Sequence, residues 1–180
     1  MSLHITYFVH STTTDNEEHK ATGTLPGELS VRGREQAVEL GKLVSTQFDA
    51  MVSSDLKRAV ESAELGFAGR FPLEQDSRLR ECDYGELNGG PEEVVKVDML
   101  GHIEEKFPGG ESYKDVEVRM RDLLADLKTR YDGKHIAFMA HQAPQLALEV
   151  IVNGKTWEEA INTDWRKTKQ WQPGWEYTFQ

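Results

Sequence analysis

Apolar and polar positions along the chain follow two periods that alternate. Short β-branched and aromatic runs, typical of buried strands, occur at residues 5–9, 48–52 and 135–140. A last run at residues 175–179 is typical of a terminal edge strand. Between these runs, apolar residues recur every three or four positions, the spacing of a helix with one buried face. The sequence therefore predicts strands that alternate with helices.

Capping residues mark where these helices begin. Ser30 precedes an apolar stripe made of Ala37, Leu40, Gly41 and Val44. Ser53 and Ser54 precede a second stripe, made of Leu56, Ala59, Val60 and Ala63. Ser112 and Asp115 resemble a capping box that opens a long helix, which Gly133 stops. A short helix is predicted over about 92–106, and Pro144 lies where a further helix would begin.

This order of elements predicts a three-layer α/β/α sandwich with a mostly parallel central sheet. The 180 residues fit one domain, 1–180, with a loop-rich lid at about 83–110. Parallel sheets of this kind bind ligands beyond the carboxyl ends of their strands. His10 and His141 each follow a predicted strand directly. We therefore expect both imidazoles at one rim of the sheet.

Composition restricts the classes of molecule that the protein is expected to bind. Hydrophobic residues make up 38% of the chain and charged residues 29%, as in an ordinary globular protein, and the net charge is -10. So acidic a surface repels nucleic acid, although a local pocket can still bind a small anion. We expect no membrane association, because no apolar run is long enough to span a bilayer. The absence of a secretion-signal pattern and the single cysteine, Cys82, favour a cytoplasmic location.

Four residues match the requirements of phosphoryl transfer through histidine. The nucleophile must be a neutral imidazole, and forked cationic donors must meet the charge on the phosphoryl oxygens. A carboxylic acid must protonate the leaving oxygen and then accept a proton from water. The candidates are His10, Arg58, Glu81 and His141.

A series of segments resembles, in order, the histidine phosphatase (phosphoglycerate mutase-like) superfamily. Val9–Asn16 resembles the family's Arg-His-Gly-x-Thr-x-x-Asn, and Thr22-Gly23 its second phosphate-contacting pair. Similar matches are Leu29–Ala37, Ser53–Ala59, Leu79–Gly85, Pro108–Ser112 and Ala140-His141. Each segment is a weak signal alone, and their shared order is specific.

The resemblance implies a three-layer α/β/α fold and a hydrolase with no metal and no organic cofactor. It implies that His10 is the phosphorylated nucleophile and Glu81 the acid/base, while Arg58 and His141 grip the phosphoryl oxygens. The expected partner is a small phosphorylated substrate. The residues expected to contact it further are Ser11, Asn16, Thr22, Gly23 and Gln142.

Three positions depart from the family pattern. Val9 replaces the arginine before the nucleophile, and Ser11 and Gln142 replace glycines that follow the two histidines. Losing one charged hydrogen bond to an anion costs about 2–3 kcal/mol, or roughly 30- to 150-fold in rate, so we expect reduced activity. Another donor is hypothesised to compensate. The candidates are the hydroxyls of residues 11–14 and the side chains of Lys20, Arg32 and Arg80.

Two alternatives to a phosphatase stay open. A phosphoglycerate-type mutase would use the same chemistry and return the phosphoryl group to the substrate. A pseudo-enzyme, suggested by Val9, would bind a phosphorylated ligand without turnover. Other chemistries fail on spacing: Cys82 lacks the arginine that a cysteine phosphatase needs six residues on, and the glycine expected five residues before Gly154 in a nucleotide-binding loop is Glu149. The histidines at 4, 19, 102 and 135 are expected to be structural.

Overall fold

A five-stranded sheet with strand order β3-β2-β4-β1-β5 forms the centre of the protein. A computed structural model describes residues 1–180. The strands are Leu3–Val9 (β1), Ala50–Ser53 (β2), Leu73–Gln75 (β3), His135–Ala140 (β4) and Trp175–Phe179 (β5). The first four are parallel, and β5 runs antiparallel to β1 at the edge. The predicted mostly parallel sheet with a terminal edge strand is confirmed.

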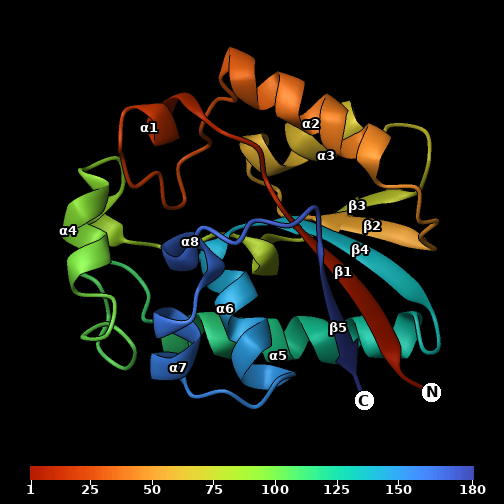
Figure 1. The fold of residues 1–180 in the computed structure, drawn as a ribbon. Coiled ribbons are helices and arrows are strands. Elements are labelled where there is room, and N and C mark those ends of the chain that lie inside the picture. Colours follow the sequence, from red (N-terminus) through yellow and green to blue (C-terminus); the bar gives the residue numbers. More distant parts are fainter.

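Helices cover both faces of this sheet, with α2 and α3 on one face and α5, α6 and α7 on the other (Figure 1). The helices are Thr14–Glu17 (α1), Val31–Leu43 (α2), Lys57–Phe67 (α3), Glu92–Val97 (α4), Tyr113–Arg130 (α5), Gln142–Ile151 (α6), Trp157–Asn162 (α7) and Trp165–Thr168 (α8). Two 3-10 helices are Ser77–Leu79 (η1) and Gly85–Leu87 (η2). The three-layer α/β/α arrangement predicted from the sequence is therefore observed.

Side chains of the two central strands divide between two cores. Successive residues of a strand point to opposite faces. Tyr7 and Phe138 accordingly belong to the larger core under α5 and α6, whereas Phe8 and Met139 belong to the smaller core under α2 and α3. Both faces of these strands are therefore apolar, and this explains their nearly continuous hydrophobic sequence.

Two of the predicted caps are present, and one is wrong. Ser30 caps α2 by accepting from the Gly33 amide, and Ser112 forms a capping box with Asp115 at the start of α5. Ser54 instead accepts from the Leu56 amide inside the turn before α3, whose N-cap, Leu56, has no side-chain cap. The short helix predicted over 92–106 ends at Val97, and turns fill most of the rest.

The carboxyl ends of β1 and β4 meet at one rim. These strands are direct neighbours, and their register pairs Val9 with Ala140. The residues that follow, His10 and His141, therefore leave the sheet at the same level. The segments that contain α1, α4 and α8 gather at this end of the sheet (Figure 1). None of the helices combines the length and the apolarity that crossing a bilayer requires.

Candidate active site

The two strand-end histidines face each other across the rim. The centroids of the His10 and His141 rings lie 5.0 Å apart, with an angle of 56° between the ring planes. The His10 amide donates to the Ala140 carbonyl at 3.0 Å, which continues the pairing of β1 with β4 by one residue. The sheet thus brings together two imidazoles that are 131 residues apart in the sequence.

His10 is held as a neutral ring, and each of its two nitrogens has one partner. Its Nδ1 lies 2.8 Å from the Ser11 carbonyl oxygen, which can only accept, so Nδ1 bears the proton. Its Nε2 is then an acceptor, and the Nε–H of Arg58 donates to it at 3.4 Å. Burial lowers the pKa of His10 to about 3, and the Arg58 charge contributes further. The ring therefore has the protonation state that a nucleophile needs.

His141 has a fixed backbone and an unpartnered side chain. The Tyr7 hydroxyl donates to the His141 carbonyl at 2.7 Å and accepts from the His141 amide at 3.0 Å. The ring is fully buried, and neither of its nitrogens has a hydrogen-bond partner. Burial, followed by the charge of Arg58, lowers the pKa of His141 well below its ordinary value. A buried polar group without a partner is costly, and this one lies against the His10 ring.

Arg58 reaches the rim from the first turn of α3 and is almost completely buried. Its Nη1 donates to the Leu25 carbonyl at 2.6 Å and its Nη2 to the Gly23 carbonyl at 2.7 Å. Gly23 has a φ of 54°, which places its carbonyl within reach, and a Cβ there would overlap the Asn88 side chain. Because Nε donates to His10, all three nitrogens of Arg58 already donate within the protein.

Glu81 occupies the amino-terminal end of α6. Its Oε1 accepts from the backbone amides of Cys82 and Ala143 at 3.0 and 2.9 Å, and its Oε2 accepts from the Gln142 amide at 3.1 Å. Arg119, on α5, fixes this segment by donating to the Glu81 carbonyl. A carboxylate that accepts three N–H groups at a helix amino terminus is stabilised there in one orientation.

A cavity of about 90 Å³ beside His10, which we call the main cavity because of its contents, contains most of the sequence-predicted residues. Its lining includes His10, Asn16, Thr22, Gly23, Arg58, Glu81 and Gln142. His141 lies behind it, fully buried. Asn16 also caps α1, by accepting from the Thr13 amide, and the Thr22 hydroxyl donates to Asp15. Ser11 is not in this lining; it borders a second cavity with Val9, His10 and Trp165, which we call the Val9 cavity.

The structure separates the three cations that could compensate for Val9. Lys20 lines the main cavity and pairs with Glu18 at 2.6 Å. Arg80 forms two hydrogen bonds to Asp55 and borders a different pocket. Arg32 is exposed on α2. Of the three, Lys20 alone is placed beside His10.

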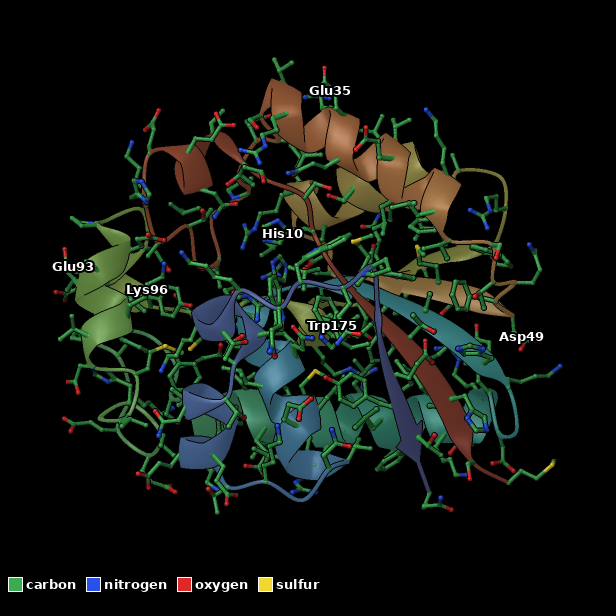
Figure 2. All side chains as sticks on the ribbon, viewed as in Figure 1. His10, Glu35, Asp49, Glu93, Lys96 and Trp175 are labelled. Atoms are coloured by element: carbon green, nitrogen blue, oxygen red, sulfur yellow. The ribbon has the colours of Figure 1, made fainter.

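Several residues that serve the site are not singled out by the sequence patterns. Lys96 lines the main cavity, and Figure 2 shows it on the inner side of α4, with Glu93 on the outer side. Tyr7 and Arg119 fix His141 and Glu81 from elements that read simply as a strand and a helix. The one sequence feature that indicates a role for any of them is the position of Arg119, a charged residue on a mostly buried part of a helix. No group of three or more His, Cys, Asp or Glu side chains is arranged to hold a metal ion.

Comparison with known proteins places this arrangement in a family. Residues 7–168 match the histidine phosphatase superfamily (branch 1). The chain belongs to this superfamily. It is 30% identical over 147 residues to the phosphatase PhoE of Bacillus subtilis, covering 81% of this chain and 75% of that protein. It is 29% identical to 6-phosphofructo-2-kinase/fructose-2,6-bisphosphatase of Aquarana catesbeiana, covering 88% of this chain, and spans 36% of that protein's length.

Solved structures of other histidine phosphatases have the same fold. YhfR of Bacillus stearothermophilus is 27% identical, with a TM-score of 0.75 over 88% of this chain and 83% of that one. A mycobacterial glucosyl-3-phosphoglycerate phosphatase complexed with VO3 is 28% identical, with a TM-score of 0.75 over 89% and 86% of the two chains. The chain is also 29% identical to a probable phosphoglycerate mutase, GpmB of Salmonella choleraesuis. It spans 66% of that protein's length.

Proposed function

We propose that the protein is a phosphomonoesterase that works through a phosphohistidine at His10. The observation that carries the proposal is the state of the facing imidazoles. His10 is neutral and its Nε2 accepts one long hydrogen bond, 3.4 Å from Arg58, whereas both nitrogens of His141 are buried without a partner. One ring is ready to attack, and the other is ready to donate to an oxyanion. Membership of a family of phosphatases and mutases supports this assignment.

The reaction proceeds in two displacements at phosphorus. In the first, Nε2 of His10 forms a bond to phosphorus, the ester P–O bond breaks, and Glu81 protonates the departing oxygen. In the second, Glu81 accepts a proton from water, the water oxygen bonds to phosphorus, and the N–P bond breaks to release phosphate. In the resting site Glu81 accepts from three N–H groups, and the proton that it passes to the leaving oxygen enters with the monoanionic form of the phosphate ester.

The phosphoryl oxygens are held by His141, by Arg58 and by the cations of the main cavity. Lys20 and Lys96 both line that cavity. Val9 contributes no donor, so we expect turnover roughly 30- to 150-fold below that of a homologue with arginine at this position. Val95 and Met99 also line the cavity. The lid at residues 83–110 therefore sets which leaving group is accepted.

An assay with a generic aryl phosphate tests the proposal. We expect phosphate release by the wild-type chain, a loss of at least about 10³-fold in His10→Asn, and a loss of about 10²- to 10³-fold in Glu81→Gln. Matched controls are His4→Asn, at the exposed opposite end of the same strand, and Glu86→Gln, exposed in the loop that follows Glu81. Unchanged rates in both site variants would contradict the proposal.

The same assay separates the alternatives. A mutase would isomerise phosphoglycerate faster than it releases phosphate. A pseudo-enzyme would bind inorganic phosphate at the main cavity and release none from any ester. The second alternative is favoured by one observation, the engagement of all three Arg58 nitrogens within the protein. The presence of Glu81 beside the histidines favours turnover, because binding alone needs no acid.

A further inference from the structure

The side of the rim beside residue 9 is short of positive charge. Val9 lines the Val9 cavity together with His10, where the family pattern has an arginine. The Arg58 side chain already donates to three carbonyls and to His10. A phosphoryl group carries about two negative charges at neutral pH. Lys20 and Lys96 line the main cavity, but no lysine or arginine lines the Val9 cavity, so binding at His10 calls for a further cation on that side.

A cation follows, in the sequence, a residue that borders the Val9 cavity. Trp165, on α8, borders the cavity beside Val9, and the next residue is Arg166. The Arg166 guanidinium lies over the Trp165 ring, 4.4 Å from its centroid. It also donates to the Gln145 side chain at 3.1 Å, from which it gains a fixed position against α6. Its side chain is 23% exposed, so solvent screens it only in part.

A chain of hydrogen bonds joins Arg166 to the main cavity. Its Nη1 donates to Oδ1 of Asp164 at 2.9 Å, and Oδ2 of Asp164 accepts from the Gln142 side chain at 2.5 Å. The Asp164 side chain is 1% exposed, and a carboxylate so deeply buried requires a charged partner. Gln142 lines the main cavity and gives its backbone amide to Glu81. Arg166 is thus two hydrogen bonds from a residue at the cavity wall.

The Arg166 charge also reaches the two imidazoles. It is one of the cations that lower the pKa of His10 and of His141, after burial and Arg58.

We propose that Arg166 is a positioning residue of this site, which supplies from α8 the positive charge that residue 9 does not. It acts from where Asp164 and Gln145 hold it, and it fixes the Gln142 side chain through Asp164. This role would connect two departures from the family pattern. Val9 removes a cation from the site, and Gln142 links the replacing cation, Arg166, to the site through Asp164. This inference rests on the proposed function, since it takes the main cavity as an oxyanion site.

Binding of inorganic phosphate, measured by calorimetry, tests the inference without requiring turnover. We expect Arg166→Met to raise the phosphate Kd about tenfold, the factor expected of one unit charge acting across several ångströms of protein interior. Arg166→Lys keeps the charge but loses the forked contact with Asp164 and Gln145, so its Kd should lie between those of wild type and Arg166→Met. Arg32→Met, which removes an exposed arginine from α2, is the matched control and should change nothing.

A rescue experiment excludes a purely structural role. Val9→Arg should restore phosphate affinity in the Arg166→Met background and should improve it much less in the wild-type background. Should Arg166→Met fail to fold, Arg166→Gln, which can still donate to Asp164, takes its place. An unchanged Kd in the folded variant, or no rescue by Val9→Arg, would overturn the inference. If His10→Asn and His141→Asn also leave phosphate binding unchanged, the proposed function itself fails.

Discussion

The carboxyl ends of β1 and β4 are neighbours in the sheet, yet they present their histidines in opposite states. At the end of β1, both nitrogens of His10 are engaged, one with the Ser11 carbonyl and one with Arg58. At the end of β4, the backbone of His141 is clamped by Tyr7, whereas neither ring nitrogen has a partner. A nucleophile must be oriented before the substrate arrives. An oxyanion donor must have its hydrogen-bonding capacity free until then.

The difference has an energetic consequence. A satisfied ring contributes to stability, whereas a buried and unsatisfied one costs free energy that is recovered only when a ligand binds. At the carboxyl end of β4, the unpaired His141 ring therefore supports activity and lowers the free energy of unfolding. Variants at the two ends should separate these effects.

The largest expected effect comes from His141→Leu. Removing the donor should lower kcat/KM for an aryl phosphate about 10²-fold, the cost of one charge-assisted hydrogen bond. The same change should raise the free energy of unfolding by about 1–2 kcal/mol without ligand, since two unpaired buried nitrogens disappear. Urea unfolding and steady-state kinetics measure the two quantities. His10→Leu is the contrasting variant, and a gain in stability there of equal size would contradict the comparison.

A smaller effect is expected from Tyr7→Phe, which leaves both rings in place. It removes the hydroxyl that pairs with the amide and the carbonyl of His141, and so leaves two buried backbone groups unpaired. We expect a loss of about 2 kcal/mol in stability and of about tenfold in kcat, because the ring is no longer fixed. Tyr131→Phe, whose hydroxyl bonds Glu74 near the surface, is the control. Equal losses in the two variants would mean that the clamp has no special role.

The smallest effect is a slope in the pH dependence of stability. The pKa of His10 is lowered to about 3, while an unfolded histidine titrates near 6.5. Between these values the unfolded chain binds a proton that the folded chain does not, so the free energy of unfolding falls as pH falls. One histidine contributes at most about 1.4 kcal/mol per pH unit.

Unfolding of wild type and of His10→Asn at pH 7, 6 and 5 isolates this contribution, because the carboxylates affect both chains alike. The variant should show the shallower slope. The exposed His4→Asn should keep the wild-type slope. Identical slopes in all three chains would show that His10 titrates normally in the folded protein.

Much of the fold follows from sequence patterns because its main elements are long and strongly periodic. β4 has the predicted bounds, and α2 and α5 begin after the predicted caps. β2 begins at Ala50 rather than at Phe48, whose ring joins the aromatic cluster with Phe8 before the strand starts. Elements of three to six residues, such as β3, α1 and α7, have too few positions to show a period.

The residues of the site also differ in whether the sequence predicts them. His10 and His141 could be paired from sequence because adjacent parallel strands end at one rim. Lys96 and Arg119 could not be assigned to the site, because each lies on a helix whose local sequence indicates only a solvated face. Ser11 shows a second limit: it adjoins the nucleophile in sequence, yet its side chain borders the Val9 cavity on the other side. Which side of a loop faces a ligand is decided by tertiary packing.

Arg119 connects the two ends of the segment 83–110. It donates to the Glu81 carbonyl, just before the segment begins, and to the Glu111 carboxylate, just after it ends. The Glu111 amide also donates to the Asp83 carbonyl, and the Asp83 amide donates to the Glu111 carboxylate. The segment between them is therefore anchored at both of its ends. Loops of other lengths could replace it, to select new substrates, without moving Glu81.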